Sequence, residues 1–153
     1  HRDLHLSLRR QRQMCIRDRG DDSGLIVPAL NNLPGLRSAR YAHENATDEE
    51  NRQHLKKELE KLELNQAKAY FVCVLVLVQD PSDPFPLFAT GLLEGSVKTT
   101  MQGDNGFGYD PMFYPKDSNV SLGEIGSDEK ALLSHRGKAI QILIKKIEGF
   151  ASE

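Results

Sequence analysis

The pattern of hydrophobic positions along the chain predicts a sheet built from three strand segments. Residues 69–78, AYFVCVLVLV, form a near-continuous run of β-branched and aromatic residues, which is typical of a strand buried on both faces. Several prolines follow, and the apolar pattern returns over residues 87–97 as a second strand. Residues 23–27, SGLIV, are a shorter third candidate.

A first helix is predicted over residues 47–63. Thr47 followed three positions later by Glu50 has the pattern of a capping box, in which each side chain bonds the other residue's backbone N–H. One face of this helix is apolar and holds Leu55, Leu59 and Leu62. Residues 31–35, NNLPG, have the composition of a turn.

Two more helices are predicted near the C-terminal end. Ser127 is placed to cap a short helix that carries Asp128 and Glu129 in its first turn. Ser134 is placed to cap a longer last helix, and Gly149 stands where its C-terminal cap is expected. The apolar stripe of the last helix consists of Ile140, Leu143, Ile144 and Ile147.

Composition narrows the class of protein. The 153 residues suffice for one domain with a hydrophobic core, and 39% hydrophobic with 27% charged residues is ordinary for a soluble protein. The net charge of -2 does not indicate a nucleic-acid-binding protein, so a polyanionic ligand needs local cations or a metal. No apolar run reaches the roughly 18 residues of a membrane span, and we predict a cytoplasmic protein without a membrane partner.

Residues 1–19 differ from the rest because they are crowded with arginine and have scattered apolar positions. We expect a disordered leader there, ahead of a folded domain over residues 20–150; a nucleic-acid-binding arm is the alternative. The two cysteines, Cys15 and Cys73, do not make a disulfide framework. Cys73 lies inside an apolar run and is expected to be a buried thiol.

Three short motifs are candidates for chemistry. GDDSG, at residues 20–24, places two carboxylates and a hydroxyl on a strand end, where adjacent side chains point to opposite sides. One carboxylate there can bind Mg²⁺ or accept a proton from water. The alternative is an Asp-rich turn whose side chains only bond the local backbone.

GDNGFGYDP, at residues 103–111, interleaves glycines with two rings. Glycines let backbone groups approach a flat ligand, and Phe107 or Tyr109 can stack on it, with Asp110 held extended before a proline. The alternative is a mobile surface loop with both rings in the core. The third motif, EKALLSHRGKA at residues 129–139, gathers cations at a helix start and suits an anion, or is only a solvated charge run.

In this order the motifs resemble the inosine/xanthosine triphosphate pyrophosphatase family. The residues that carry the resemblance are DDSGL at 21–25, LPGLRSARYA at 33–42, FVCVLVLV at 71–78, GDNGFGYDPMF at 103–113 and EIGSDEKALLSHRGKA at 124–139. The resemblance covers about residues 20–147. It implies an α/β fold of two lobes around a central mixed β-sheet, and a homodimer.

The resemblance also implies an activity and a site. The family hydrolyses ITP, dITP and XTP to the monophosphate and pyrophosphate with Mg²⁺, which cleanses the nucleotide pool. Asp22 is implied as the proton acceptor and magnesium ligand. The substrate-binding residues implied are Ser23, Phe107, Gly108, Tyr109, Asp110, Lys130, His135 and Arg136.

The chain departs from the family before Gly20. The family's TGNxxK and ENAxxKA patterns do not occur there. We therefore expect the N-terminal part of the fold to be missing, with residues 1–19 a leader foreign to the family and residues 20–150 a partial pyrophosphatase domain. Two alternatives to an active enzyme stay open: an impaired fragment that only binds nucleotide, and a protein that binds nucleic acid through the arginine-rich leader.

Overall fold

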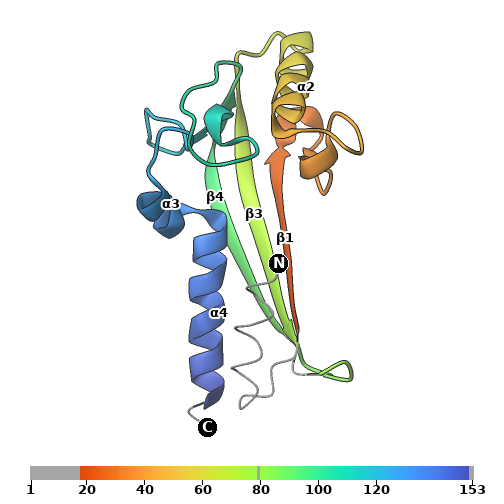
Figure 1. Cartoon of the computed structure of the whole chain (residues 1–153), viewed down its shortest axis with the longest axis vertical. Coiled ribbons are helices and arrows are strands. Elements are labelled where there is room, and N and C mark those ends of the chain that lie inside the picture. Colours follow the sequence, from red (N-terminus) through yellow and green to blue (C-terminus); the bar gives the residue numbers. More distant parts are fainter. Residues whose placement is uncertain (1–17, 79, 152–153) are drawn as a thin grey trace.

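Three long strands run side by side through most of the length of the molecule (Figure 1). They are β1 (Asp18–Val27), β3 (Gln66–Val78) and β4 (Leu87–Lys98). The structure is a computed structural model that describes residues 18–78 and 80–151. Of the leader predicted over residues 1–19, all but the last two residues lie outside the described part, and those two begin β1.

Two short strands, β2 (Leu33–Gly35) and β5 (Phe113–Pro115), complete a five-stranded sheet of order β2-β1-β3-β4-β5. All of its described pairs are antiparallel, so the expected mixed sheet is wrong for the described residues. A short connection joins β3 to β4, and such hairpins force the antiparallel direction. Because β2 pairs only with residues 25–27 of β1, residues 18–24 have β3 on one side and no strand on the other within the described chain.

The sheet has one covered and one open face. In β3, side chains alternate between buried and more accessible positions, so the prediction of burial on both faces is wrong. Leu75 is fully buried, whereas its neighbour Val74 is 37% exposed. We call the side of Leu75 the first face and the side of Val74 the second face. On the second face Phe88 and Leu92 of β4 are also exposed.

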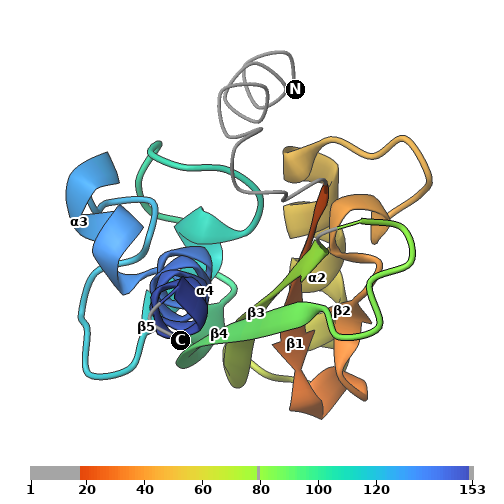
Figure 2. The same ribbon diagram turned by 90° about the horizontal axis from the view of Figure 1, so that it is seen from below.

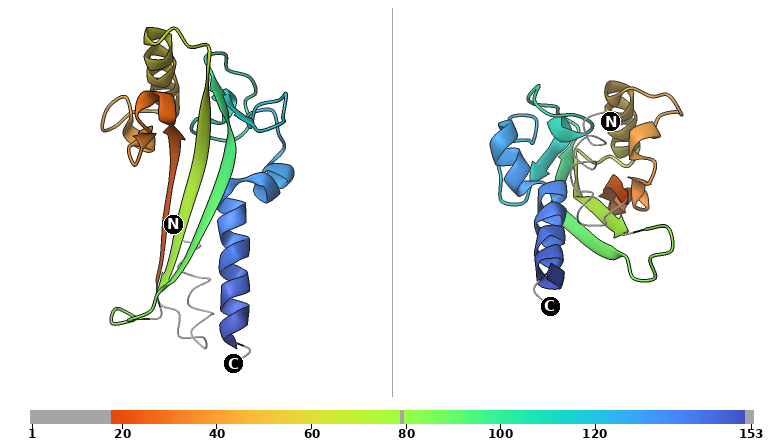
Figure 3. Two further views of the ribbon diagram at one scale, coloured as in Figure 1. Left: turned by 180° about the vertical axis from the view of Figure 1, so that it is seen from behind. Right: turned by 60° about the horizontal axis from the view of Figure 1, so that its bottom comes forward.

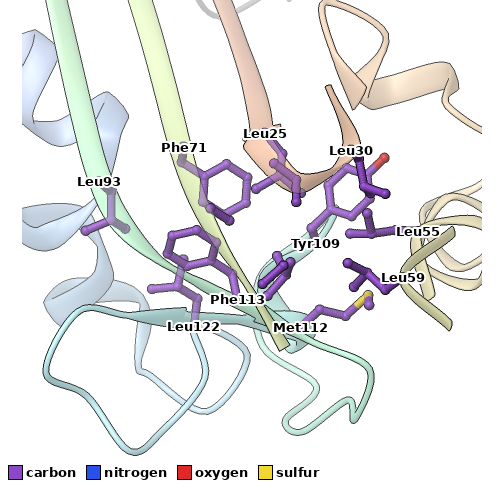
Figure 4. Close-up of a cluster of buried hydrophobic side chains, with 14 of the residues drawn as sticks. Leu25, Leu30, Leu55, Leu59, Phe71, Leu93, Tyr109, Met112, Phe113 and Leu122 are labelled. Carbon is purple, nitrogen blue, oxygen red and sulfur yellow. The ribbon is translucent and has the colours of Figure 1, made fainter. Parts of the chain in front are cut away.

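Two hydrophobic clusters build the core on the first face. One lies at the end of the sheet near α2 (Asp48–Lys61), and Figure 4 shows Phe71 and Phe113 side by side in it, with Tyr109 next to Leu55 of α2. The other lies under α4 (His135–Ala151), which packs along β4 (Figures 2 and 3). Its members are Cys73, Leu75, Leu77, Ala89, Ala139 and Leu143. Cys73 is thus the buried thiol that the sequence predicted.

The helix starts follow the local sequence signals. Thr47 and Glu50 form the predicted capping box at α2, whose Leu55 and Leu59 are buried while Leu62 is exposed. The Ser134 hydroxyl accepts a hydrogen bond from the Gly137 N–H at 3.0 Å, which confirms Ser134 as the cap of α4.

Other helix boundaries differ from the prediction. The α4 helix continues through Gly149 to Ala151, so the predicted C-terminal cap is wrong, and of its predicted stripe Ile140 and Ile144 are exposed. The short helix α3 (Ser127–Leu133) has Gly126 as its N-cap, so Ser127 is its first residue and not its cap.

Three 3-10 turns complete the described elements: η2 (Pro28–Leu30), η3 (Ser38–Arg40) and η4 (Asp110–Met112). None of the helices described here is long and apolar enough to cross a membrane. Strands and helices together form an α/β architecture in which helices, turns and loops leave the second face of the sheet largely open.

Candidate functional site

A pocket of about 620 Å³ opens on the first face of the sheet, above the start of α4. Asp21 and Ser23 of β1 form part of its wall, and Phe71 of β3 forms another part. The glycine-rich loop of residues 105–110 and the junction between α3 and α4 close the other sides. Segments separated by more than a hundred residues therefore meet around one hollow.

Of the nine site residues implied by the sequence, eight line this pocket and one does not. The eight are Ser23, Phe107, Gly108, Tyr109, Asp110, Lys130, His135 and Arg136. The ninth, Asp22, is absent from the wall, and Asp21 stands there instead. The register explains the difference, because Asp22 pairs with Val74 on the second face and Asp21 with Leu75 on the first.

The glycine-rich loop is folded around Asp110. The Asp110 carboxylate is buried, accepts a hydrogen bond from the Phe107 N–H at 2.8 Å and forms an ion pair with Lys130. Gly106 has a φ of 82°, and a Cβ there would lie 2.2 Å from Asp110 Oδ2, so this position requires glycine. The Phe107 ring is left 62% exposed, with Lys130 Nζ 4.7 Å from its centroid.

Tyr109 has a different place from Phe107. Its ring is buried in the core cluster, and its hydroxyl donates a hydrogen bond to the Ser38 carbonyl at 2.8 Å. Burial, with the nearby Tyr41 and Asp48, raises the pKa of this phenol. Of the two rings in the motif, only Phe107 is free to stack on a ligand.

His135 stands as a neutral imidazole at the start of α4. Its ring stacks on Phe71, with centroids 4.9 Å apart and planes 13° from parallel. Burial, then the neighbouring charges of Arg136 and Lys130, lowers the pKa of His135 to about 4. At neutral pH one ring nitrogen donates and the other accepts.

Two buried polar atoms of the pocket wall have no hydrogen-bond partner among the described residues. They are His135 Nδ1 and Ser23 Oγ. Buried polar atoms are almost always paired, and leaving one unpaired costs about 1–3 kcal/mol. Both residues line the same hollow, so a polar ligand there is a candidate partner for each atom.

Asp21 is one of three carboxylates that line the pocket, together with Asp48 and Asp110. Its Oδ1 lies 3.3 Å from Arg136 Nη2. The described residues contain no cluster of three or more His, Cys, Asp or Glu suited to a metal ion. Mg²⁺ usually keeps several waters and takes only one or two protein carboxylates, so Asp21 has the ligand chemistry that this ion prefers.

Several wall residues were not among the predicted site residues, and Asp21, Asp48 and Phe71 are three of them. For Asp21 a signal existed, because Leu25 and Val27 are apolar and share their strand face with residues 21 and 23. The same alternation in β3 places Phe71 on the face of the buried Cys73 and Leu75. Asp48 comes from the distant helix α2, and no local pattern indicates that it reaches the pocket.

Comparisons with known proteins agree on one family. A sequence model of the Ham1 family matches residues 8–146. The chain is 47% identical over 127 residues to a dITP/XTP pyrophosphatase of Idiomarina loihiensis, covering 83% of this chain and 63% of that protein. It is 46% identical over 128 residues to the dITP/XTP pyrophosphatase of Vibrio cholerae, covering 84% and 64%.

Solved structures give the same answer. A HAM1 protein from Coxiella burnetii superposes with a TM-score of 0.81 at 40% identity, covering 86% of this chain and 66% of that one. The Staphylococcus aureus Ham1 protein gives 0.77 at 38% identity, with the same coverage. The chain thus spans about 63–66% of the length of the relatives it matches.

Proposed function

Because this chain belongs to the Ham1 family, we propose that its pocket binds inosine and xanthosine nucleotides and that the encoded activity is their hydrolysis. Relatives named dITP/XTP pyrophosphatase support this substrate class. One observation of the chain itself carries the proposal. Ser23 Oγ and His135 Nδ1 have no hydrogen-bond partner among the described residues, and the exposed ring of Phe107 lines the same pocket.

The chemistry of the wall suits a 6-keto purine. The Phe107 ring offers an exposed face for stacking, which contributes about 1–3 kcal/mol per base. His135 and Arg136 can donate to the 6-keto oxygen of hypoxanthine or xanthine, whereas adenine has an amino donor at that position. Donors left unpaired against adenine are costly, and this disfavours ATP.

The proposed reaction is the addition of water to phosphorus, with cleavage of the α–β anhydride bond and departure of pyrophosphate. A bound Mg²⁺ would neutralise charge on the phosphate oxygens. In this proposal Asp21 would hold that ion and orient or deprotonate the water, and Arg136 beside it would hold an anionic group. The sequence-based assignment of these roles to Asp22 stays a prediction.

A binding experiment tests the site separately from turnover. Isothermal titration of the full chain with ITP, XTP and ATP should show the first two binding at least roughly tenfold more tightly than ATP. Equal affinity for all three, or no binding, would sink the proposal. Release of pyrophosphate from ITP with Mg²⁺ then separates an active enzyme from the second candidate, a module that binds without turnover.

That second candidate has a specific observation in its favour. The chain spans about 63% of the relatives' length, and the described residues contain no cluster of three or more His, Cys, Asp or Glu suited to a metal ion. Binding of ITP with no pyrophosphate release would select this candidate. We further propose a homodimer, as the resemblance implied, and a cytoplasmic location, as the composition predicted. The exposed side chains of Phe88 and Leu92 offer an apolar surface that a second copy can bury, and light scattering tests the dimer.

A further inference from the structure

Two side chains of helix α2 bind the backbone N–H and the backbone carbonyl of Gly108 in the glycine-rich loop. The Gly108 N–H donates to Asp48 Oδ2 at 2.7 Å, and the Gly108 carbonyl accepts from Arg52 Nη1 at 2.6 Å. Asp48 and Arg52 are four residues apart and so lie on one side of the helix. Gly108 lies at least 56 residues further along the chain, so the contact is entirely tertiary.

The two side chains are themselves fixed. Arg52 is only 16% exposed, and its Nε and Nη2 also donate to Glu49 Oε2 at 3.2 and 2.8 Å. Asp48 is the first residue of α2, where the capping box sets the backbone. The buried Asn51 binds the Ala42 N–H and the Ala39 carbonyl, which ties this turn to the preceding segment.

The held residue lies between the two rings of the loop. On one side Tyr109 is anchored in the core, and on the other Phe107 is exposed in the pocket. With Gly108 fixed, the backbone on both sides of the Phe107 ring is fixed, since Asp110 holds the Phe107 N–H. The distance from this ring to His135 across the pocket therefore depends on the contact with α2.

We propose that Asp48 and Arg52 are positioning residues that set the Phe107 ring for a purine and determine which base the pocket accepts. The inference rests on the proposed nucleotide site. Neither side chain needs to touch the base. They act through the Gly108 peptide, so removing them lets the Phe107 ring move. A purine can then shift in the pocket, and adenine no longer has to leave the wall donors unpaired.

The test pairs Asp48→Ala with Asp48→Asn in the full chain. The asparagine keeps an oxygen that accepts from the Gly108 N–H, whereas the alanine does not. Titration of Asp48→Ala should show the affinity for inosine 5′-monophosphate falling about tenfold and the affinity for adenosine 5′-monophosphate changing less. The ratio of the two affinities should therefore fall toward one. Asp48→Asn should keep most of the wild-type ratio.

Arg52→Met is the second variant, in case Asp48→Ala does not fold, and it is expected to lower the ratio in the same direction. The matched control is Gln53→Ala, because Gln53 sits on the same turn and bonds only Glu49 among the contacts seen here. It should leave both affinities unchanged. Equal losses for inosine and adenosine in Asp48→Ala or Arg52→Met would mean a merely structural role and overturn the inference.

An exchange measurement separates this inference from the proposed function. In the ligand-free chain the Gly108 amide proton should exchange about tenfold faster in Asp48→Ala than in the wild type, as seen by NMR. Unchanged exchange overturns the positioning role even if nucleotides bind. If the wild type binds neither nucleotide, the proposed function fails and the selectivity role fails with it, while faster exchange still establishes the hold of α2 on the loop.

Discussion

The same strands form both faces of the sheet, but one face is buried and the other is exposed. On the first face, Leu75 and Ala89 are buried under α4, and the pocket opens beside them. On the second face, Val74 and Leu92 are 37% and 49% exposed. A step of one residue along β1, from Asp21 to Asp22, moves a carboxylate from the pocket wall to the open side. Packing and chemistry are thus concentrated on one side.

The largest expected effect comes from Gly91→Val on the first face. A Cβ at Gly91 would lie 1.8 Å from the His135 carbonyl oxygen and 2.6 Å from the Ala139 nitrogen, both backbone atoms of α4. The helix cannot stay in place, and we expect unfolding in urea to show a loss of about 3 kcal/mol or more. The adjacent Thr90→Val on the second face should change stability by less than about 0.5 kcal/mol.

The next effect compares two neighbours in β3. Leu75→Ala removes a fully buried side chain and should cost about 2–5 kcal/mol. Val74→Ala, on the second face, should cost less than about 1 kcal/mol, because part of that side chain already meets water. Urea denaturation followed by circular dichroism measures both. Equal losses would mean that the second face is covered in solution.

The third comparison is between the two acids of β1. Asp21→Asn should weaken binding of ITP with Mg²⁺ by about tenfold in titration calorimetry, since it removes a charge that the pocket offers to the ion. Asp22→Asn should leave the affinity unchanged. The reverse result would restore the sequence-based choice of Asp22 and contradict the face assignment argued from the register.

The last comparison is a pH dependence that arises on the first face. The pKa of His135 is lowered to about 4 in the folded chain, against an ordinary value near 6.5 in the unfolded chain. Between these values the unfolded state binds the proton and the folded state does not, so stability falls as the pH drops from about 6.5 to 4. His135→Gln should flatten that fall in urea titrations at several pH values; an unchanged slope would contradict the assignment.

Much of the fold could be predicted because its signals are local. The capping box of Thr47 and the cap at Ser134 depend on residues three positions apart, and both are present. The burial of only one face of β3 could not be predicted in the same way, because a continuous apolar run has the same sequence pattern whether one face of the strand is covered or both are.

In the site, too, local motifs could be predicted and contacts between distant residues could not. The motifs brought Phe107 and His135 to one pocket, whereas the choice between Asp21 and Asp22 required strand alternation to be applied to the whole of β1. The hold of Asp48 and Arg52 on Gly108 joins residues at least 56 positions apart. Such a contact has no signature in either segment alone, because it depends on how α2 and the loop pack together.

The edge of β1 over residues 18–24, beside which the described residues place no further strand, has a practical consequence. A strand edge bonds any extended backbone, whatever its side chains, so this stretch is a ready template for another polypeptide to lie against. We therefore expect the purified chain to self-associate through that edge at high concentration. Dilute samples, or a lysine substituted at Gly20, should keep it in solution.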